Sequence, residues 1–140
     1  MMGLQAASIK LSGDAKYRSD ASLLANELIG QMWVSDRTPT TLQANFQGGA
    51  GTNGVVYSSW VNNVSRALPG VSGVAANQPI VNICPEGNVG CPPVVGTSIS
   101  SQVTITIFWK APNESASTGK LCGVTNTSAS HCYIAMAQII

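Results

Sequence analysis

The chain has 140 residues, of which 44% are hydrophobic and only 9% are charged, and its formal net charge is +1. This length corresponds to one domain with a single core. The seven basic residues are spread among six acidic ones without a basic run, which disfavours a nucleic-acid-binding protein. No uninterrupted apolar stretch is long enough to span a membrane.

The first third of the sequence predicts one long helix over residues 3–35. Small or apolar residues recur along it at helical spacing, and Lys10, Asp14 and Arg18 are each four apart, as in ion pairs on a helix surface. About thirty helical residues form a rod of roughly 45 Å, longer than a compact domain of this chain length. We therefore expect part of the helix to protrude. Because no capping signal precedes it, we interpret the chain as a fragment of a longer helical protein. A break at Gly13 is the alternative.

The following segments predict a loop, a second helix and then strands. Residues 38–54 are predicted as a loop because they contain Pro39 and a run of glycines. Residues 56–68 predict a short amphipathic helix that stops at Leu68-Pro69-Gly70. Alternation then predicts strands at residues 78–83, 102–110 and 131–140. With no helix between the last two strands, the sheet is expected to be antiparallel. The fold class predicted is α+β, a single domain over residues 1–140 with its sheet within residues 78–140.

Four cysteines, Cys84, Cys91, Cys122 and Cys132, favour disulfide bonds over a metal site. None forms a C-x-x-C pair, and the chain has a single histidine, His131. Four cysteines allow three connectivities, and proximity in sequence favours Cys84–Cys91 and Cys122–Cys132. Disulfides would indicate an oxidising compartment, whereas four reduced thiols are the alternative.

The residues of the first helix carry a family resemblance. The string G-L-Q-A-x-S at residues 3–8, followed by Arg18-Ser19 and Leu24-Ala25, resembles the segment after the membrane-embedded part of type IV minor pilins. The pilus-modification (PilV) type is the closest match, and the Leu68-Pro69-Gly70 stretch and a later strand similar to VTITIFW add to it. Together these matches cover about half of the chain.

This resemblance implies a pilin fold, in which a long N-terminal helix packs on an antiparallel sheet. It also implies an inner-membrane precursor processed by a prepilin peptidase, with a methylated N-terminus, that enters an extracellular pilus from the periplasm. The cleavage motif, the apolar first segment and the glutamate near the mature N-terminus of the family are missing from this sequence. The Cys122–Cys132 loop resembles the disulfide-bounded region of many pilins.

The candidate functional surface is therefore a helix face rather than a catalytic centre. The stripe formed by Leu4, Ala7, Leu11 and Ala15 is predicted to dock against other minor pilins and the major pilin, with the inner-membrane assembly machinery as a further partner of the full-length form. No catalytic residue, cofactor, metal or small-molecule substrate is predicted, because His131 lacks an acid nearby in sequence and adjacent strand residues face opposite ways. A type II secretion pseudopilin, an adhesin or ligand-binding module and a DNA-uptake subunit are the alternatives.

Overall fold

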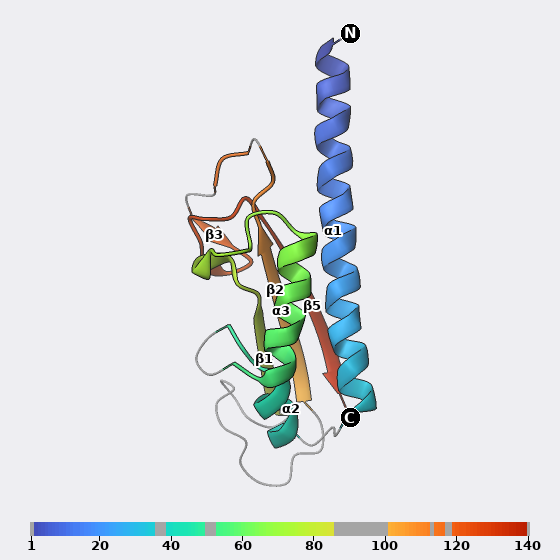
Figure 1. Ribbon diagram of the computed structural model, residues 1–140, viewed down its shortest axis with the longest axis vertical. Coiled ribbons are helices and arrows are strands. Elements are labelled where there is room, and N and C mark those ends of the chain that lie inside the picture. Colours follow the sequence, from blue (N-terminus) through green and yellow to red (C-terminus); the bar gives the residue numbers. More distant parts are fainter. Residues whose placement is uncertain are drawn as a thin grey trace.

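The computed structural model describes residues 2–35, 39–49, 53–85, 101–112, 114–116 and 119–139, with backbone alone for 2–14, 39–40 and 84–85. Its element order is three helices, a short 3-10 turn (η1, Ala75–Asn77) and five strands. One helix runs the length of the molecule beside a small sheet, and two shorter helices lie over that sheet (Figure 1). The predicted α+β class is confirmed for the described residues: an N-terminal helix packs on a three-stranded antiparallel sheet.

Helix α1 spans Met2–Val34 without a break at Gly13. Its buried residues recur three and four apart, so they share one face; they are Ala21, Leu24, Ala25, Leu28 and Met32. This face joins the core formed with α3 and the sheet. In the last turn of the helix, Met32 is buried, whereas Trp33 is 41% exposed.

A second helix, α2 (Pro39–Phe46), lies where the sequence predicted a loop, so that prediction is wrong. Pro39 is its first residue, a position where the missing N–H costs nothing because helix-starting N–H groups have no intrahelical partner. Leu42 and Phe46 lie one turn apart and are both buried. Burial of these two side chains against the sheet thus overrides the weak local signal of an eight-residue segment.

Helix α3 (Val55–Ala67) confirms the second predicted helix. Trp60, Val64 and the C-cap residue Leu68 are buried, and Tyr57 joins them. The chain then turns at Gly70, where φ is +75°. A Cβ at this glycine would approach the side chain of Lys110 to 2.8 Å, so the left-handed conformation and the close approach both require glycine.

The main sheet has the order β1-β2-β5 and is antiparallel throughout. Its strands are β1 (Ile80–Pro85), β2 (Ser101–Trp109) and β5 (His131–Ile139), close to the three predicted strands. Along β2, the alternation holds: Val103, Ile105, Ile107 and Trp109 all enter the core shared with the helices. Phe108, which the alternation places on the opposite face, is also buried and pairs in register with Cys132.

A small hairpin was not predicted. Strands β3 (Lys120–Leu121) and β4 (Val124–Thr125) pair through a two-residue turn at Cys122-Gly123. Both turn residues have positive φ, +52° and +80°, which is the signature of the type I′ hairpin turn. Cysteine is an uncommon residue in this left-handed position.

Candidate interaction surface

Helix α1 changes its environment along its length. From Tyr17 onward its inner face packs on α3 and β5, whereas its first turns extend past the sheet and the other helices (Figure 1). The opposite face of the packed half carries apolar side chains that the core does not use: Leu23 is 68% exposed and Val34 is 87% exposed. Within the described residues, α1 is therefore uncovered along its protruding arm and on the outer face of its packed half.

The predicted docking stripe lies on this arm. Leu4, Ala7 and Leu11 belong to α1 by backbone, but their side chains lie outside the described residues. Ala15, the fourth member of the stripe, is exposed. At 3.6 residues per turn, the four positions share one side of the helix.

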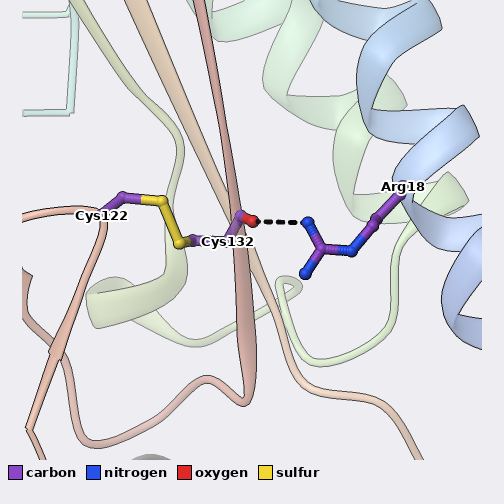
Figure 2. The surroundings of a disulfide bond; sticks show 3 residues. All are labelled: Arg18, Cys122 and Cys132. Carbon is purple, nitrogen blue, oxygen red and sulfur yellow. Dashed lines mark hydrogen bonds between the residues drawn. A yellow bond between two sulfur atoms is a disulfide. The ribbon is translucent and has the colours of Figure 1, made fainter.

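Arg18 marks the place where α1 meets the sheet. Its guanidinium Nη1 donates to the carbonyl oxygen of Cys132 at 3.4 Å (Figure 2). Its Cζ also lies 5.7 Å from the ring centre of Trp109, a cation–π distance. The Arg18 side chain thus links α1 to both β5 and β2. Residues of α1 that precede it extend past the sheet (Figure 1).

His131, the first residue of β5, contacts Trp109 and an acidic loop residue. Its ring stacks on the Trp109 indole with centroids 5.7 Å apart, and its Nε2 lies 2.6 Å from Oε2 of Glu114. Both side chains are mostly covered, at 24% and 13% exposure. This acid could not be predicted from the sequence, because it is seventeen residues from His131, within the connection between β2 and β5, where no local pattern indicates a pairing.

The predicted Cys122–Cys132 disulfide is confirmed. Its sulfur atoms are 2.02 Å apart and it joins the β3–β4 turn to the start of β5 (Figure 2). Because Cys132 is oxidised in this bond, it supplies no thiol that His131 could activate. The second predicted disulfide, Cys84–Cys91, lies outside the described residues, which include neither the side chain of Cys84 nor any part of Cys91.

Two buried amides hold the disulfide-bounded loop in place. Nδ2 of Asn126 donates to the Ala76 carbonyl at 2.9 Å and to Oδ1 of Asn77 at 3.1 Å. Its Oδ1 accepts from the backbone N–H groups of Ser128 and Ala129. Asn77 in turn donates to the carbonyls of Gly70 and Ser128. The loop is therefore hydrogen-bonded to η1 and, through Asn77, to the turn that follows α3.

Other kinds of site find no support in the described part of the chain. No three His, Cys, Asp or Glu side chains of that part gather as metal ligands would. Within the same residues, no helix combines the length and apolar character that crossing a bilayer requires.

Comparisons with known proteins identify no relative of this chain. No family model matches the chain, no curated protein matches it, and no solved structure matches it.

Proposed function

We propose that this chain is the periplasmic domain of a type IV minor pilin of the pilus-modification type. In this proposal it is a structural subunit that joins pilus assembly by packing α1 against other minor pilins and the major pilin. The full-length precursor would sit in the bacterial inner membrane, and the assembled subunit in the pilus, close to its tip. The mechanism is helix packing and involves no chemical step.

The observation that carries the proposal is the division of α1 into a packed half and an arm. The packed half is fixed by buried residues from Ala21 to Met32 and by the Arg18 contacts. The arm extends about 15 residues further, roughly 20 Å at 1.5 Å per residue. A helix gains most of its stability from packing, so an arm with an apolar stripe is best explained by neighbouring helices. The resemblance of residues 3–8 and of the later helix positions to minor pilins supports pilins as those neighbours.

The test is a binding assay between purified proteins. The domain would be immobilised and offered the other minor pilins and the major pilin from the same source, and the secretion pseudopilins in parallel. Binding to minor pilins supports the proposal; binding to pseudopilins alone replaces it with a secretion-system subunit, and no binding to either contradicts it.

Two variants make the assay specific for the arm. Leu11→Glu places a charge in the predicted stripe, and we expect it to reduce binding at least tenfold while the thermal unfolding midpoint changes little. Leu23→Glu is the matched control, because Leu23 lies about 120° away around the helix and is already exposed. Equal loss of binding in both variants would contradict docking through the stripe.

A further inference from the structure

The lysine and arginine side chains that the structure describes lie at one end of the molecule. They belong to α1, α3, β3 and the segment that follows β2, all near the end of the sheet past which the arm of α1 extends (Figure 1). They are Lys16, Arg18, Arg66, Lys110 and Lys120. At the opposite end of the sheet, the described residues include no lysine or arginine. These cations are far apart in sequence, so no basic run predicts that they gather.

Three of these cations are brought together at the end of β2. Lys110 directly follows Trp109, and the Cζ atom of Arg18 lies 5.7 Å from the centre of the Trp109 ring. The backbone N–H of Lys110 donates to the carbonyl oxygen of Pro69 at 3.0 Å. Arg66 lies in the last turn of α3, shortly before Pro69. The end of β2 therefore contacts both α1 and the end of α3, and each of the three segments carries one cation.

The disulfide and α1 place the other two cations at the same end. Lys120, the first residue of β3, is close in sequence to Cys122, which is bonded to Cys132 near the start of β5. The carbonyl oxygen of Cys132 in turn accepts from Arg18. Lys16 precedes Arg18 by about half a turn of α1, so these two side chains leave the helix on opposite sides.

Four of these cations have no counter-charge among the described residues. We call them the basic rim: Lys16, Arg66, Lys110 and Lys120. Lys110 is half-buried and the other three are exposed, and none of the four forms an ion pair within the described part of the chain. Of the nearby carboxylates, Glu114 is bound to His131 at 2.6 Å. Asp20, one turn after Lys16, is half-buried and forms no ion pair with it. The basic rim is therefore an uncompensated positive surface.

We propose that the basic rim binds aspartate and glutamate side chains of the protein that docks on the arm of α1. This inference rests on the proposed function of the arm. The arm leaves the body beside the rim (Figure 1), so a partner that covers the arm down to Arg18 also covers part of the rim. Withdrawing a cation from water is unfavourable unless an opposite charge replaces the water. The partner therefore needs carboxylates where its contact with the arm reaches the body.

An acidic protein fits the basic rim better than a nucleic acid does. The four cations come from four different segments, and the net charge of the whole chain is only +1. Domains that bind nucleic acid carry many cations along one face, because each phosphate contact needs its own cation. A few cations beside an apolar helix stripe are instead typical of a protein interface, in which charges at the edge steer the partner and fix its register.

The first experiment measures how fast a minor pilin that binds this domain associates with it at two salt concentrations. Between about 0.1 M and about 1 M salt, the screening length falls from about 10 Å to about 3 Å. We expect the association rate constant to fall roughly tenfold. An association rate constant that is independent of salt would overturn the proposal for the rim, although docking through the arm would still stand.

Variants that neutralise single charges assign the effect to the rim. Lys110→Gln and Lys120→Gln should each lower the association rate constant about threefold, and both together about tenfold. Lys120 is exposed, so its variant keeps the test valid if Lys110→Gln loses stability. Gln102→Glu is the matched control, because it lowers the net charge equally at an exposed position near the opposite end of β2. It should leave the rate nearly unchanged. An equal loss in this control would overturn the proposal, since the partner would then respond to net charge alone.

Carbodiimide cross-linking identifies the chemistry of the partner. This reagent joins a lysine amine to a carboxylate as an amide where the two groups are in contact, and peptide mass spectrometry locates the bond. We expect links from Lys16, Lys110 or Lys120 to aspartate or glutamate of the bound pilin, and links from Lys10 alone would overturn the proposal. Binding of a fluorescent DNA duplex that the double variant loses, without such links, would replace the acidic protein with a nucleic acid. If no pilin binds the domain, the proposed function and the proposal for the rim fail together.

Discussion

The indole N–H of Trp60 on α3 donates to the backbone carbonyl of Leu24 on α1 at 2.9 Å, in the buried interface between the two helices. A mid-helix carbonyl ordinarily accepts one hydrogen bond from the backbone N–H four residues later. The indole N–H of Trp60 is therefore a second donor to the Leu24 carbonyl. The side chain itself is 2% exposed. Trp60 therefore fixes the position of α3 along α1 by a directed bond as well as by apolar contact.

Removing this bond should destabilise the domain measurably. Trp60→Phe keeps an aromatic ring but loses the N–H and some volume, and we expect the free energy of unfolding to fall by about 2 kcal/mol. Urea denaturation followed by circular dichroism measures it. Val55→Ala on the same helix, at an exposed position, should change the free energy by less than about 0.5 kcal/mol; a similar loss in both variants would contradict the assigned role.

We expect the domain to lose stability when the side-chain nitrogen of Asn126 is replaced by oxygen. Asn126→Asp keeps the shape and the oxygen that accepts from Ser128 and Ala129, but it turns a second oxygen toward the Ala76 carbonyl and Asn77 Oδ1. We expect a loss of about 2–4 kcal/mol at neutral pH, because two donated bonds become repulsive contacts. Asn62→Asp, an exposed position on α3, is the control and should be nearly neutral in the same thermal melt.

Burial raises the pKa of Tyr57 to about 12 from 10.0, and its hydroxyl donates to the Pro79 carbonyl. Between these two values the unfolded chain has lost the proton and the folded chain retains it. The contribution of Tyr57 to stability should therefore be constant below about pH 10 and fall as the pH rises toward 12, by up to about 1.4 kcal/mol per pH unit.

Tyr57→Phe tests this dependence. The variant should be less stable at neutral pH, because the hydrogen bond is lost, but it should have a flatter stability profile between pH 10 and 12. Tyr133→Phe keeps Tyr57 and should keep the steep profile. Parallel slopes for wild type and Tyr57→Phe in alkaline urea titrations would show that another group governs this range.

The disulfide and the left-handed turn at Cys122 can be separated by two double variants. Cys122→Ser with Cys132→Ser removes the bond, whose cysteines are ten residues apart, and should cost about 2.5–3 kcal/mol in the chain-entropy model. Cys122→Gly with Cys132→Ser removes the same bond but relieves the positive φ of +52°. We expect it to be about 1 kcal/mol more stable than the serine pair. If the two pairs melt at one temperature, the turn is not strained.

The sequence predicted the elements whose signals are local and repeated. The long helix, α3 and the three main strands follow from periodicity, and Cys122–Cys132 follows from proximity in sequence. Helix α2 was missed because eight residues give too few turns for a period, and its stability comes from burying Leu42 and Phe46. The β3–β4 hairpin was missed because its strands have two residues each and its turn begins with cysteine rather than asparagine or glycine.

The contacts that position the candidate surface were beyond sequence reasoning for a different reason. Arg18 reaches Cys132 across 114 residues, and Asn77 meets Asn126 across 49. Such pairs form only when the fold brings distant segments together. In a single sequence, nothing distinguishes a polar residue that becomes buried from one that stays in solvent. The side chains of Leu4, Ala7 and Leu11 lie outside the described residues, so their docking role stays a prediction.

The side-chain amides of Gln43 and Gln47 bind the backbone of Ile83 on the outer strand β1, and they set a chemical lifetime for the sheet. Deamidation of Gln47 would leave an oxygen still able to accept from Ile83, but deamidation of Gln43 would replace its donor nitrogen with a carboxylate facing the Ile83 carbonyl. A single ageing event at Gln43 would thus leave one carbonyl of this edge strand without its partner and destabilise the sheet. Old preparations should therefore unfold at a lower temperature in proportion to Gln43 deamidation, which peptide mass spectrometry can follow over storage.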